Sequence, residues 1–316
     1  MGAALTVQLL GQFGICSGNC SIASKLTERL QSLLAYLLLH ADSPQSRLHL
    51  AFLFWPDASE SNSRNSLRQL IHQLRRALPE AERYIRGDAN TVQWVTDPSV
   101  RVDVTLFDTA LAEAERAGKA GDATRRRVCL ERAADLCRGP LLPSCLDDWI
   151  VPERERLGRQ CEASTAAFVA TLEQSREYGS AIDRVRHWLQ HDPFDEEAHR
   201  WLMKLLALSG DRAAALTAYR QCEQALRREF ATEPSAATVR VYERVRDAEP
   251  APSERSSRRT ELPALSPLVG RHAEWMRLRE SWKRASEGRS SFVVVTGDAG
   301  IGKSRLAEEL VTFAQR

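Results

Sequence analysis

The sequence predicts a mainly α-helical protein with three regions, and three observations support this prediction. Residues 1 to about 100 mix short helical and strand patterns. Residues 103–248 show helical periodicity interrupted by glycine and proline, and residues 267–316 place an apolar strand and a glycine loop among helical patterns. A chain of 316 residues with 43% hydrophobic and 27% charged residues has the composition of two or three globular domains.

Composition argues against several classes of protein. No apolar run approaches the ~20 residues that span a bilayer, and the first residues lack a secretory signal, so we expect no membrane contact. The seven cysteines include no Cys-x-x-Cys pair, which argues against a disulfide framework and a zinc site. We therefore expect the protein to work in the reducing cytoplasm. We expect Cys129, Cys137, Cys161 and Cys222 to be small side chains of the core.

The N-terminal region contains a short series of elements in a defined order. Periodicity predicts a strand at 6–10, helices at 26–41 and 46–55, a third helix that starts at 59 or 61 and runs to 78, and paired strands at 84–86 and 92–95. Ser46 can cap the second helix, which must end by Trp55 because Pro56 follows. Residues 87–90 supply the hairpin turn. A strand, three helices and a terminal hairpin are the element order of a winged helix-turn-helix.

The third predicted helix, residues 61–78, is basic although the whole chain carries a net charge of only +2. Between Ser61 and Pro79 lie four arginines and one histidine, with no acidic residue. At about 100° per residue, the leucines and Ile71 fall on one side, which we expect to pack on the first helix. The polar residues on the other side form the predicted basic face, which consists of Arg64, Asn65, Arg68, His72, Arg75 and Arg76.

The basic face suits DNA, because arginine can bond guanine or a phosphate and asparagine can bond adenine. The alternative is a solvated arginine surface, and the position of the helix before a hairpin favours DNA. His72 ranks below the arginines as a base contact. On the hairpin, Arg86 either reaches a phosphate or stays solvated, and Trp94 is expected to pack inward rather than touch a sugar.

Residues 103–248 predict an all-α domain that resembles tetratricopeptide repeats. The stretch is alanine-rich, and glycines and prolines divide it into helices of ordinary length. The sequence at 178–181 recurs in similar form at 209–213, and Asp192-Pro193 recurs as Glu233-Pro234. A period near ~34 residues with small residues at helix contacts is typical of tetratricopeptide repeats.

The last part of the sequence predicts a linker and a nucleotide-binding loop. Residues 249–266 contain three prolines, four serines and mixed charges, which indicates an interdomain linker. Residues 297–304 then match the P-loop pattern G-x-x-x-x-G-K-[ST], after an apolar strand at 292–296. In a complete domain Lys303 would reach the β- and γ-phosphates of ATP and Ser304 would coordinate magnesium. The predicted nucleotide-binding residues are Gly297, Gly300, Gly302, Lys303 and Ser304.

Hydrolysis by the chain as it stands is not expected. Only 12 residues follow Ser304, which leaves no room for a second acidic strand or a finger arginine. One strand and two helices cannot bury a core, so we expect the chain to be the N-terminal part of a longer protein, in which the ATPase is complete. The alternative is a vestigial nucleotide site. No nucleophile–base–acid constellation indicates another enzyme.

Together these motifs resemble a known family, the SARP/AfsR-type bacterial transcriptional regulators. The run 53–60 (Leu-Phe-Trp-Pro-Asp-Ala-Ser-Glu), with Arg64 and residues 66–68 and 74–78, is similar to their winged helix. Residues 102–103, Phe107, 139–142, Trp149 and 233–235 are similar to their bacterial transcriptional activation domain. Residues 267–271 before the P-loop resemble the entry to the STAND-type ATPase module of the large members.

The resemblance implies an OmpR-like winged helix at 1–100, an activation domain at 103–248, a linker at 249–266 and an incomplete P-loop NTPase domain at 267–316. It implies a cytoplasmic regulator that binds tandem promoter repeats in double-stranded DNA and recruits RNA polymerase. In large members it implies ATP-dependent self-association on DNA. It gives the basic face the role of recognition helix and the P-loop residues the role of binding phosphate.

Two other functions fit parts of the sequence. The first alternative is a nucleotide-dependent signalling ATPase whose helical repeats bind protein partners. Loss of nucleotide binding in Lys303→Ala, with promoter binding intact, would argue against this for the chain itself. The other alternative is a repeat scaffold without a nucleic-acid role, which would be favoured if residues 1–100 lacked any salt-sensitive affinity for DNA.

Overall fold

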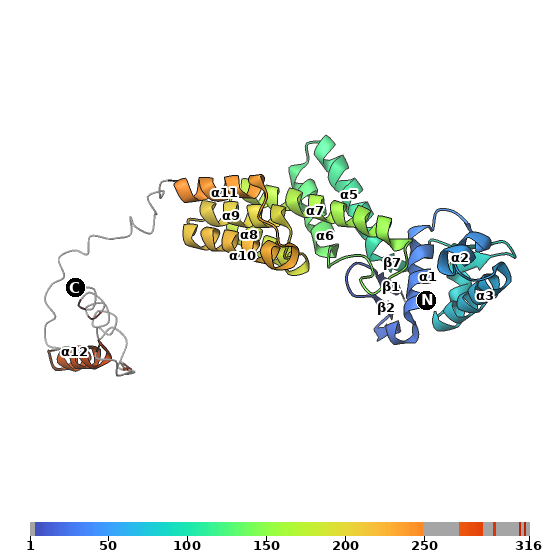
Figure 1. The fold of residues 1–316 in the computed structure, drawn as a ribbon, viewed down its shortest axis with the longest axis horizontal. Coiled ribbons are helices and arrows are strands. Elements are labelled where there is room, and N and C mark those ends of the chain that lie inside the picture. The colour runs from blue at the N-terminus through green and yellow to red at the C-terminus, as the bar shows by residue number, and fades with distance from the viewer. Residues whose placement is uncertain (1–3, 249–271, 287–292, 295–309, 311–312, 314–316) are drawn as a thin grey trace. The chain divides into compact units, whose positions relative to one another are not determined.

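The structure is a computed structural model that describes residues 4–248, 272–286, 293–294, 310 and 313. The chain divides into two compact units, Met1–Glu249 and Pro250–Arg316. In the first unit a small mixed domain leads into a long helical region, which confirms the predicted mainly α fold (Figure 1). In the second unit the described helix is α12 (His272–Ser286), whose Trp275 ring meets Phe313 edge-on with centroids 5.8 Å apart.

A four-stranded sheet begins the N-terminal domain. Its strands, in the order β3-β2-β1-β7, are β3 (Cys20–Ser21), β2 (Gly14–Ser17), β1 (Leu5–Gln8) and β7 (Val100–Val102). Strand β1 confirms the strand expected at 6–10. Strand β7 pairs parallel with β1, with Leu5 opposite Val100. Strands β3 and β7 have only two and three residues, too few for an alternation to be visible in the sequence.

Three helices follow, with ends within two residues of those predicted: α1 (Glu28–Leu39), α2 (Arg47–Phe54) and α3 (Glu60–Ala77). The hydroxyl of Ser46 accepts a hydrogen bond from the backbone N–H of His49 at 3.4 Å, so Ser46 is the expected N-cap of α2. Helix α1 is central, because Leu33, Leu34 and Leu37 are completely buried.

The predicted hairpin forms the wing. It consists of β5 (Ile85–Gly87) and β6 (Thr91–Trp94), and the short strand β4 (Gln45–Ser46) joins them in the order β4-β6-β5. Short helices η1 (Ala23–Lys25) and α4 (Ala81–Tyr84) precede α1 and β5. Trp94 is 2% exposed and stacks on Tyr84, with centroids 5.5 Å apart, so the expected inward packing of Trp94 is confirmed.

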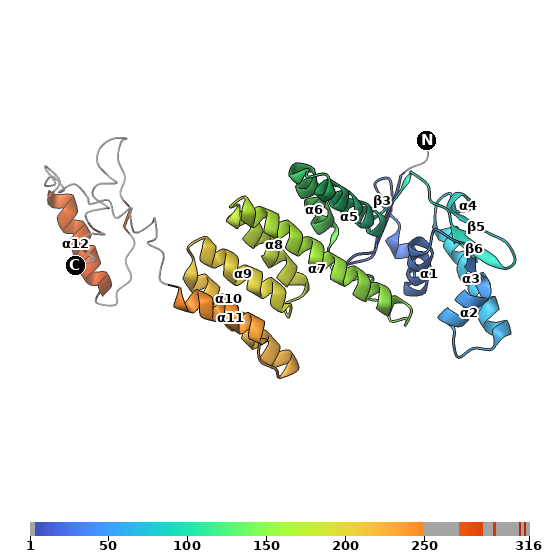
Figure 2. The ribbon, with the colours of Figure 1, turned by 90° about the horizontal axis from the view of Figure 1, so that it is seen from above.

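The helical region confirms the all-α prediction for residues 103–248. Helix α7 extends from the N-terminal domain to the group α8–α11 (Figure 2). Helices α8 and α10 begin 34 residues apart, in agreement with the predicted repeat. The helices are α5 (Asp103–Lys119), α6 (Ala123–Leu136), α7 (Ile150–Gln174), α8 (Tyr178–His191), α9 (Glu196–Leu208), α10 (Arg212–Phe230) and α11 (Ala236–Asp247).

Two apolar cores lie in the first unit. The first contains Phe54 of α2 together with Phe107 of α5 and Leu157 of α7, so the N-terminal domain and the first helices share one core. The second core fills the space among α5–α11 and contains Trp188 and Met203. Because the first core crosses from the mixed domain into the helical region, the two are joined by packing as well as by the chain.

Asp103 ties the start of α5 to the end of β1. Its carboxylate accepts backbone N–H groups from Leu9, Leu10 and Val104, each at 2.8 Å. Burial raises the pKa of Asp103, and the three backbone donors oppose that rise. Asp103, the first residue of α5, therefore satisfies the N–H groups of the two residues that follow the first strand by one and two positions.

Two glycines let the loop after α6 lie against the end of β1. The N–H of Gly11 donates to the Pro140 carbonyl at 2.9 Å, and the N–H of Leu142 donates to the Leu9 carbonyl at 2.9 Å. Gly11 has a φ of +82°, and a Cβ there would lie 2.6 Å from the Arg138 carbonyl oxygen. A Cβ on Gly139 would lie 3.2 Å from the Gly11 Cα. Side chains at either position would push the loop away from the strand.

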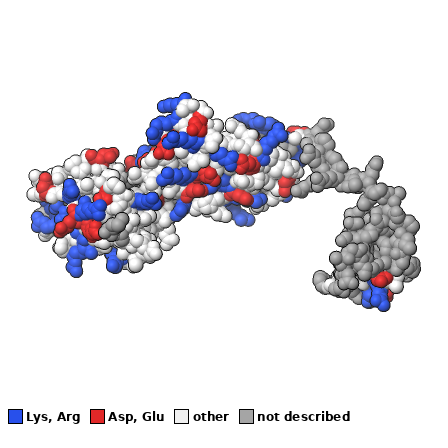
Figure 3. All heavy atoms as spheres, turned by 180° about the vertical axis from the view of Figure 1, so that it is seen from behind, with Lys and Arg blue, Asp and Glu red and all other residues white. Residues whose placement is uncertain are grey.

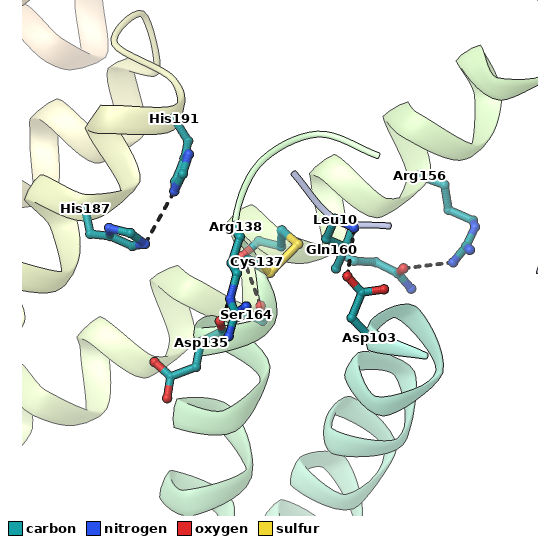
Figure 4. Close-up of a disulfide and its surroundings, with 11 residues drawn as sticks. Leu10, Asp103, Asp135, Cys137, Arg138, Arg156, Gln160, Ser164, His187 and His191 are labelled. Carbon is teal, nitrogen blue, oxygen red and sulfur yellow. Dashed lines mark hydrogen bonds between the residues drawn. A yellow bond between two sulfur atoms is a disulfide. The ribbon is translucent and has the colours of Figure 1, made fainter. Parts of the chain in front are cut away.

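The prediction that all the cysteines are unpaired is wrong for two of them. Cys137 and Cys161 form a disulfide between the end of α6 and the middle of α7, with Cα atoms 5.8 Å apart (Figure 4). The packing of α7 on α6 brings together residues 24 positions apart, and no local spacing announces such a pair. Cys129 and Cys222 are buried free thiols, as expected.

No helix among the described residues is both long enough and apolar enough to cross a bilayer. Within the same residues, no group of three or more His, Cys, Asp or Glu side chains could hold a metal ion.

Candidate DNA-binding surface

The apolar side of α3 fixes the helix to the domain. Leu67, Leu70, Ile71 and Leu74 are all at least nine-tenths buried and belong to the first core. They face α1 and α2, which contact α3 directly. The opposite side of α3 is therefore held outward by its own packing.

The outward side of α3 carries five of the six residues of the predicted basic face. They are Arg64, Asn65, Arg68, His72 and Arg76, and all five side chains are exposed. Gln69 and Gln73 are exposed on the same helix. The sequence reasoning did not select these two glutamines, although their amides can bond adenine as asparagine can. Their place four residues apart among the arginines was the available signal.

Ion pairing leaves the basic face largely free. Arg64 pairs with Glu60 at 2.7 Å, one turn away, with more than half of each side chain exposed. Such surface pairs contribute little and yield easily to another anion. Within residues 4–248, Arg68, Arg75 and Arg76 have no carboxylate at ion-pair distance, and Arg75 bonds a backbone carbonyl instead.

Arg75 lies at the edge of the basic face rather than on it. Its side chain is half-buried, and Nη2 donates to the Ile85 carbonyl oxygen of the wing at 3.2 Å. Its Nε is buried and has no hydrogen-bond partner in the structure. The sequence placed Arg75 beside the other arginines, and the docked wing turns it into a residue of the helix–wing junction.

Arg47 is a basic residue of this surface that the sequence reasoning missed. Its backbone N–H donates to the Asn90 carbonyl at 2.8 Å, and its Nε donates to the Thr91 carbonyl at 3.1 Å. Burial lowers the pKa of Arg47, and nearby Arg75 and Arg68 lower it further, whereas Asp88 acts in the opposite direction. The positive charges of Arg75 and Arg68 thus both act on Arg47, an arrangement that an anion would stabilise.

The wing has a rigid tip. The Asp88 carboxylate accepts the N–H groups of Asn90 and Thr91 at 2.8 and 2.7 Å, and these bonds lower the pKa of Asp88. A Cβ on Gly87 would lie 2.4 Å from the Thr91 carbonyl, so glycine is needed there. Arg86 is exposed on β5, opposite Gln93, as predicted. The tip therefore presents Arg86 on a fixed hairpin.

Positive charge is a local feature of this molecule. On the face drawn in Figure 3, basic and acidic side chains alternate over the described surface. This agrees with the net charge of +2. The acid-free stretch of α3 is an exception to that mixture, and a local basic helix is the pattern expected for DNA recognition.

The predicted nucleotide site lies outside the described residues. This applies to Gly297, Gly300, Gly302, Lys303 and Ser304 alike. The linker predicted at 249–266 lies outside the described residues as well.

Comparison with protein families finds three domains along the chain. Residues 23–90 match the family described as transcriptional regulatory protein, C terminal. Residues 102–246 match the bacterial transcriptional activator domain, and residues 267–316 match the AAA ATPase domain. A winged helix with an exposed basic helix, followed by an activator domain, defines a DNA-binding transcriptional regulator.

Individual relatives narrow this class. The regulatory protein AfsR of Streptomyces griseus is 26% identical over 99% of this chain and 33% of its own length. AfsR of Streptomyces coelicolor is 26% identical over 88% of this chain and 29% of its own length. The chain is therefore similar to regulators of the SARP/AfsR type over most of its own length. It spans about a third of the length of these curated relatives.

A solved structure shares the fold. Mycobacterium tuberculosis EmbR, determined in complex with a low-affinity phosphopeptide, superposes with a TM-score of 0.60 and 18% identity. The match covers 92% of this chain and 74% of that one. The likeness extends the winged-helix and helical-domain arrangement to a second protein.

Proposed function

We propose that the chain binds repeated promoter sequences by inserting α3 into the major groove while the wing holds the backbone. The observation that carries the proposal is the exposed polar face of α3, held outward by a completely packed opposite side. Recognition helices of this architecture read base edges from such a face. Arg64, Asn65, Arg68, His72 and Arg76 face the groove in this proposal, and Arg47, Arg75 and Arg86 supply charge for phosphates.

The rest of the protein converts binding into regulation. We assign the winged helix to 1–100, the activator domain to 103–248, the linker to 249–266 and the start of the ATPase to 267–316. The activator domain contacts RNA polymerase in the cytoplasm, and adjacent repeats bring two copies of the chain together. In the longer protein the P-loop binds ATP, with Lys303 on the β- and γ-phosphates and Ser304 on magnesium.

Selection of bound sequences from a random DNA pool by the full chain tests the central step. We expect an enriched repeat. Titration against salt then tests the residues, because each lost phosphate contact lowers the slope of log affinity on log salt by about one unit. Arg68→Ala should lower the slope in this way or relax one base position by ~1–3 kcal/mol.

Arg132→Ala is the matched control, because Arg132 is an exposed arginine on α6, away from the wing. It should leave both the slope and the selected sequence unchanged. A pool without enrichment, or equal behaviour of the Arg68 and Arg132 variants, would overturn the proposal.

A further inference from the structure

The disulfide between Cys137 and Cys161 lies where the helical region meets the N-terminal domain. Both residues are half-buried in the wall of a cavity of about 250 Å³. Leu10, Pro140 and Trp188 line the same cavity. Figure 4 shows the disulfide between α6 and α7, with His187 and His191 of α8 on one side. A small reagent can therefore reach the sulfur atoms without unfolding of the chain.

The segment that begins at Cys137 carries contacts to the N-terminal domain over its whole length. Residues 137–149 include Pro140 and Leu142, which make the two backbone bonds described above to Gly11 and Leu9, just after β1. Asp147 accepts the hydroxyl of Ser32 at 2.5 Å and pairs with Arg29, both on α1. The indole of Trp149 donates to the same hydroxyl at 3.1 Å. We call residues 137–149 the bridging segment.

Two attachments hold the bridging segment on α7. Arg154 donates to the carbonyl oxygens of Leu141, Leu142 and Cys145 at 2.9, 2.8 and 3.0 Å. The disulfide is the second attachment, and it fixes the first residue of the segment to Cys161. Reduction would remove the covalent attachment and leave Arg154 in place.

We propose that Cys137 and Cys161 form a reversible thiol–disulfide site that exchanges with a dithiol reductant and sets how firmly the bridging segment is held. This inference rests on the proposed function, because a promoter-binding protein works in a reducing cytoplasm. Disulfides in that compartment are usually transient and redox-sensing rather than structural. A purely structural disulfide belongs to oxidising compartments.

The thiol–disulfide exchange needs no reagent other than the dithiol. A thiolate of the dithiol attacks one sulfur, the Cys137–Cys161 bond breaks, and a mixed disulfide forms with one free cysteine thiolate. The second thiol of the reductant then displaces the other cysteine. The reductant leaves as a disulfide, and the protein gains two electrons and two protons. Reaction with an oxidised dithiol runs the same steps in reverse.

The other cysteines of the chain differ from this pair in ways that matter for exchange. Cys129, Cys145 and Cys222 are buried. Burial raises the pKa of Cys222 to about 12 and raises that of Cys129, so neither forms much thiolate at neutral pH. Cys16 and Cys20 lie on β2 and β3 and are more accessible, but they are free. They provide the natural control.

The experiment uses the full chain equilibrated in mixtures of reduced and oxidised dithiothreitol. Free thiols are trapped by alkylation and located by mass spectrometry, and amide hydrogen exchange is followed in parallel. We expect Cys137 and Cys161 to become alkylated together as the reduced fraction rises, while the chain stays folded. Exchange of amides in residues 137–149 should then rise about tenfold or more.

Paired variants separate the site from general thiol chemistry. The double variant Cys137→Ser/Cys161→Ser should show the faster amide exchange in residues 137–149 in every mixture. The double variant Cys16→Ser/Cys20→Ser should behave as the unchanged chain does. The proposal is overturned if the two cysteines are alkylated equally in all mixtures, or if they resist reduction until the chain unfolds. Unchanged amide exchange in the first pair of variants would also overturn it.

DNA binding is a separate readout. Reduction should lower the affinity for a two-repeat DNA by about fivefold or more, the lower end of usual coupling between sites. Equal affinity of the oxidised and reduced chains would overturn the link to regulation. Absence of DNA binding in both states would instead count against the proposed function, and the exchange reaction would stand by its own measurements.

Discussion

Arg75 on α3 donates a hydrogen bond to the Ile85 carbonyl oxygen on β5, so α3 and the wing are directly joined. Arg47 makes a similar bond to Thr91 on the other strand of the hairpin. Polar bonds from two arginines thus position the wing, and both arginines keep unneutralised charge close to the expected DNA backbone. Anion binding and wing position are linked at this junction.

Arg75→Ala should loosen the wing even without DNA. The change removes the bond to Ile85, and we expect faster amide exchange in residues 85–94 with little change in α1. DNA affinity should fall by ~1–3 kcal/mol, because the lost bond and lost charge both act at the backbone. Hydrogen exchange and a DNA titration measure the two effects.

Arg68→Ala is the control for that experiment. Arg68 is exposed and makes no bond to the wing among the described contacts. The Arg68→Ala variant should bind DNA more weakly, without any change in the amide exchange of the hairpin. Equal hairpin exchange in the Arg75 variant and the unchanged chain would show that apolar packing, and not Arg75, positions the wing.

Trp94→Ala should destabilise the N-terminal domain by ~3–5 kcal/mol, as expected for a large aromatic removed from a core. Trp94 is 2% exposed and stacks on Tyr84. Urea denaturation followed by circular dichroism measures the loss. Trp282→Ala is the comparison, because Trp282 is 42% exposed on α12 and should change stability little. A small effect at Trp94 would mean that the wing contributes little to the domain's stability.

Local sequence signals were enough to predict the helices and the outward face of α3. Apolar residues at helical spacing determine both which segments are helical and which side is buried, and that spacing is visible in one stretch of chain. Arg47 could not be found in this way, because its role depends on β4 pairing with β6, with Ser46 opposite Thr91. The β1–β7 pairing and the disulfide depend on contacts between distant residues in the same way.

Asp103→Asn should change how stability depends on pH. Burial raises the pKa of Asp103, so the folded chain takes up a proton at higher pH than the unfolded chain does. Asp103 therefore stabilises the folded state increasingly as the pH falls towards the ordinary aspartate pKa of about 4. This stabilisation is lost as pH rises through the raised pKa.

The amide side chain of the Asp103→Asn variant does not titrate, and one of its two polar atoms can no longer accept an N–H group. We expect the variant to be less stable by ~1–3 kcal/mol at neutral pH. The difference from the unchanged chain should widen as the pH falls towards the ordinary aspartate value, measured by urea denaturation at several pH values. A difference that narrows on acidification would mean that the three backbone donors outweigh burial.

Gly11→Ala tests the junction between the loop after α6 and β1, and Gly210→Ala is a matched control. Both glycines have positive φ, +82° and +87°, so alanine meets similar backbone strain of ~1–2 kcal/mol at each. Only at Gly11 would the new Cβ collide, at 2.6 Å from the Arg138 carbonyl, whereas nothing lies within 4 Å at Gly210. The excess destabilisation of the Gly11 variant therefore measures how tightly the loop must approach the strand.

We expect this excess to come with faster amide exchange in residues 137–149, because displacement of the loop breaks the bond from Gly11 to Pro140. Equal losses at the two positions, measured by urea denaturation, would show that the loop can move aside without cost and that the first core alone holds the two domains together.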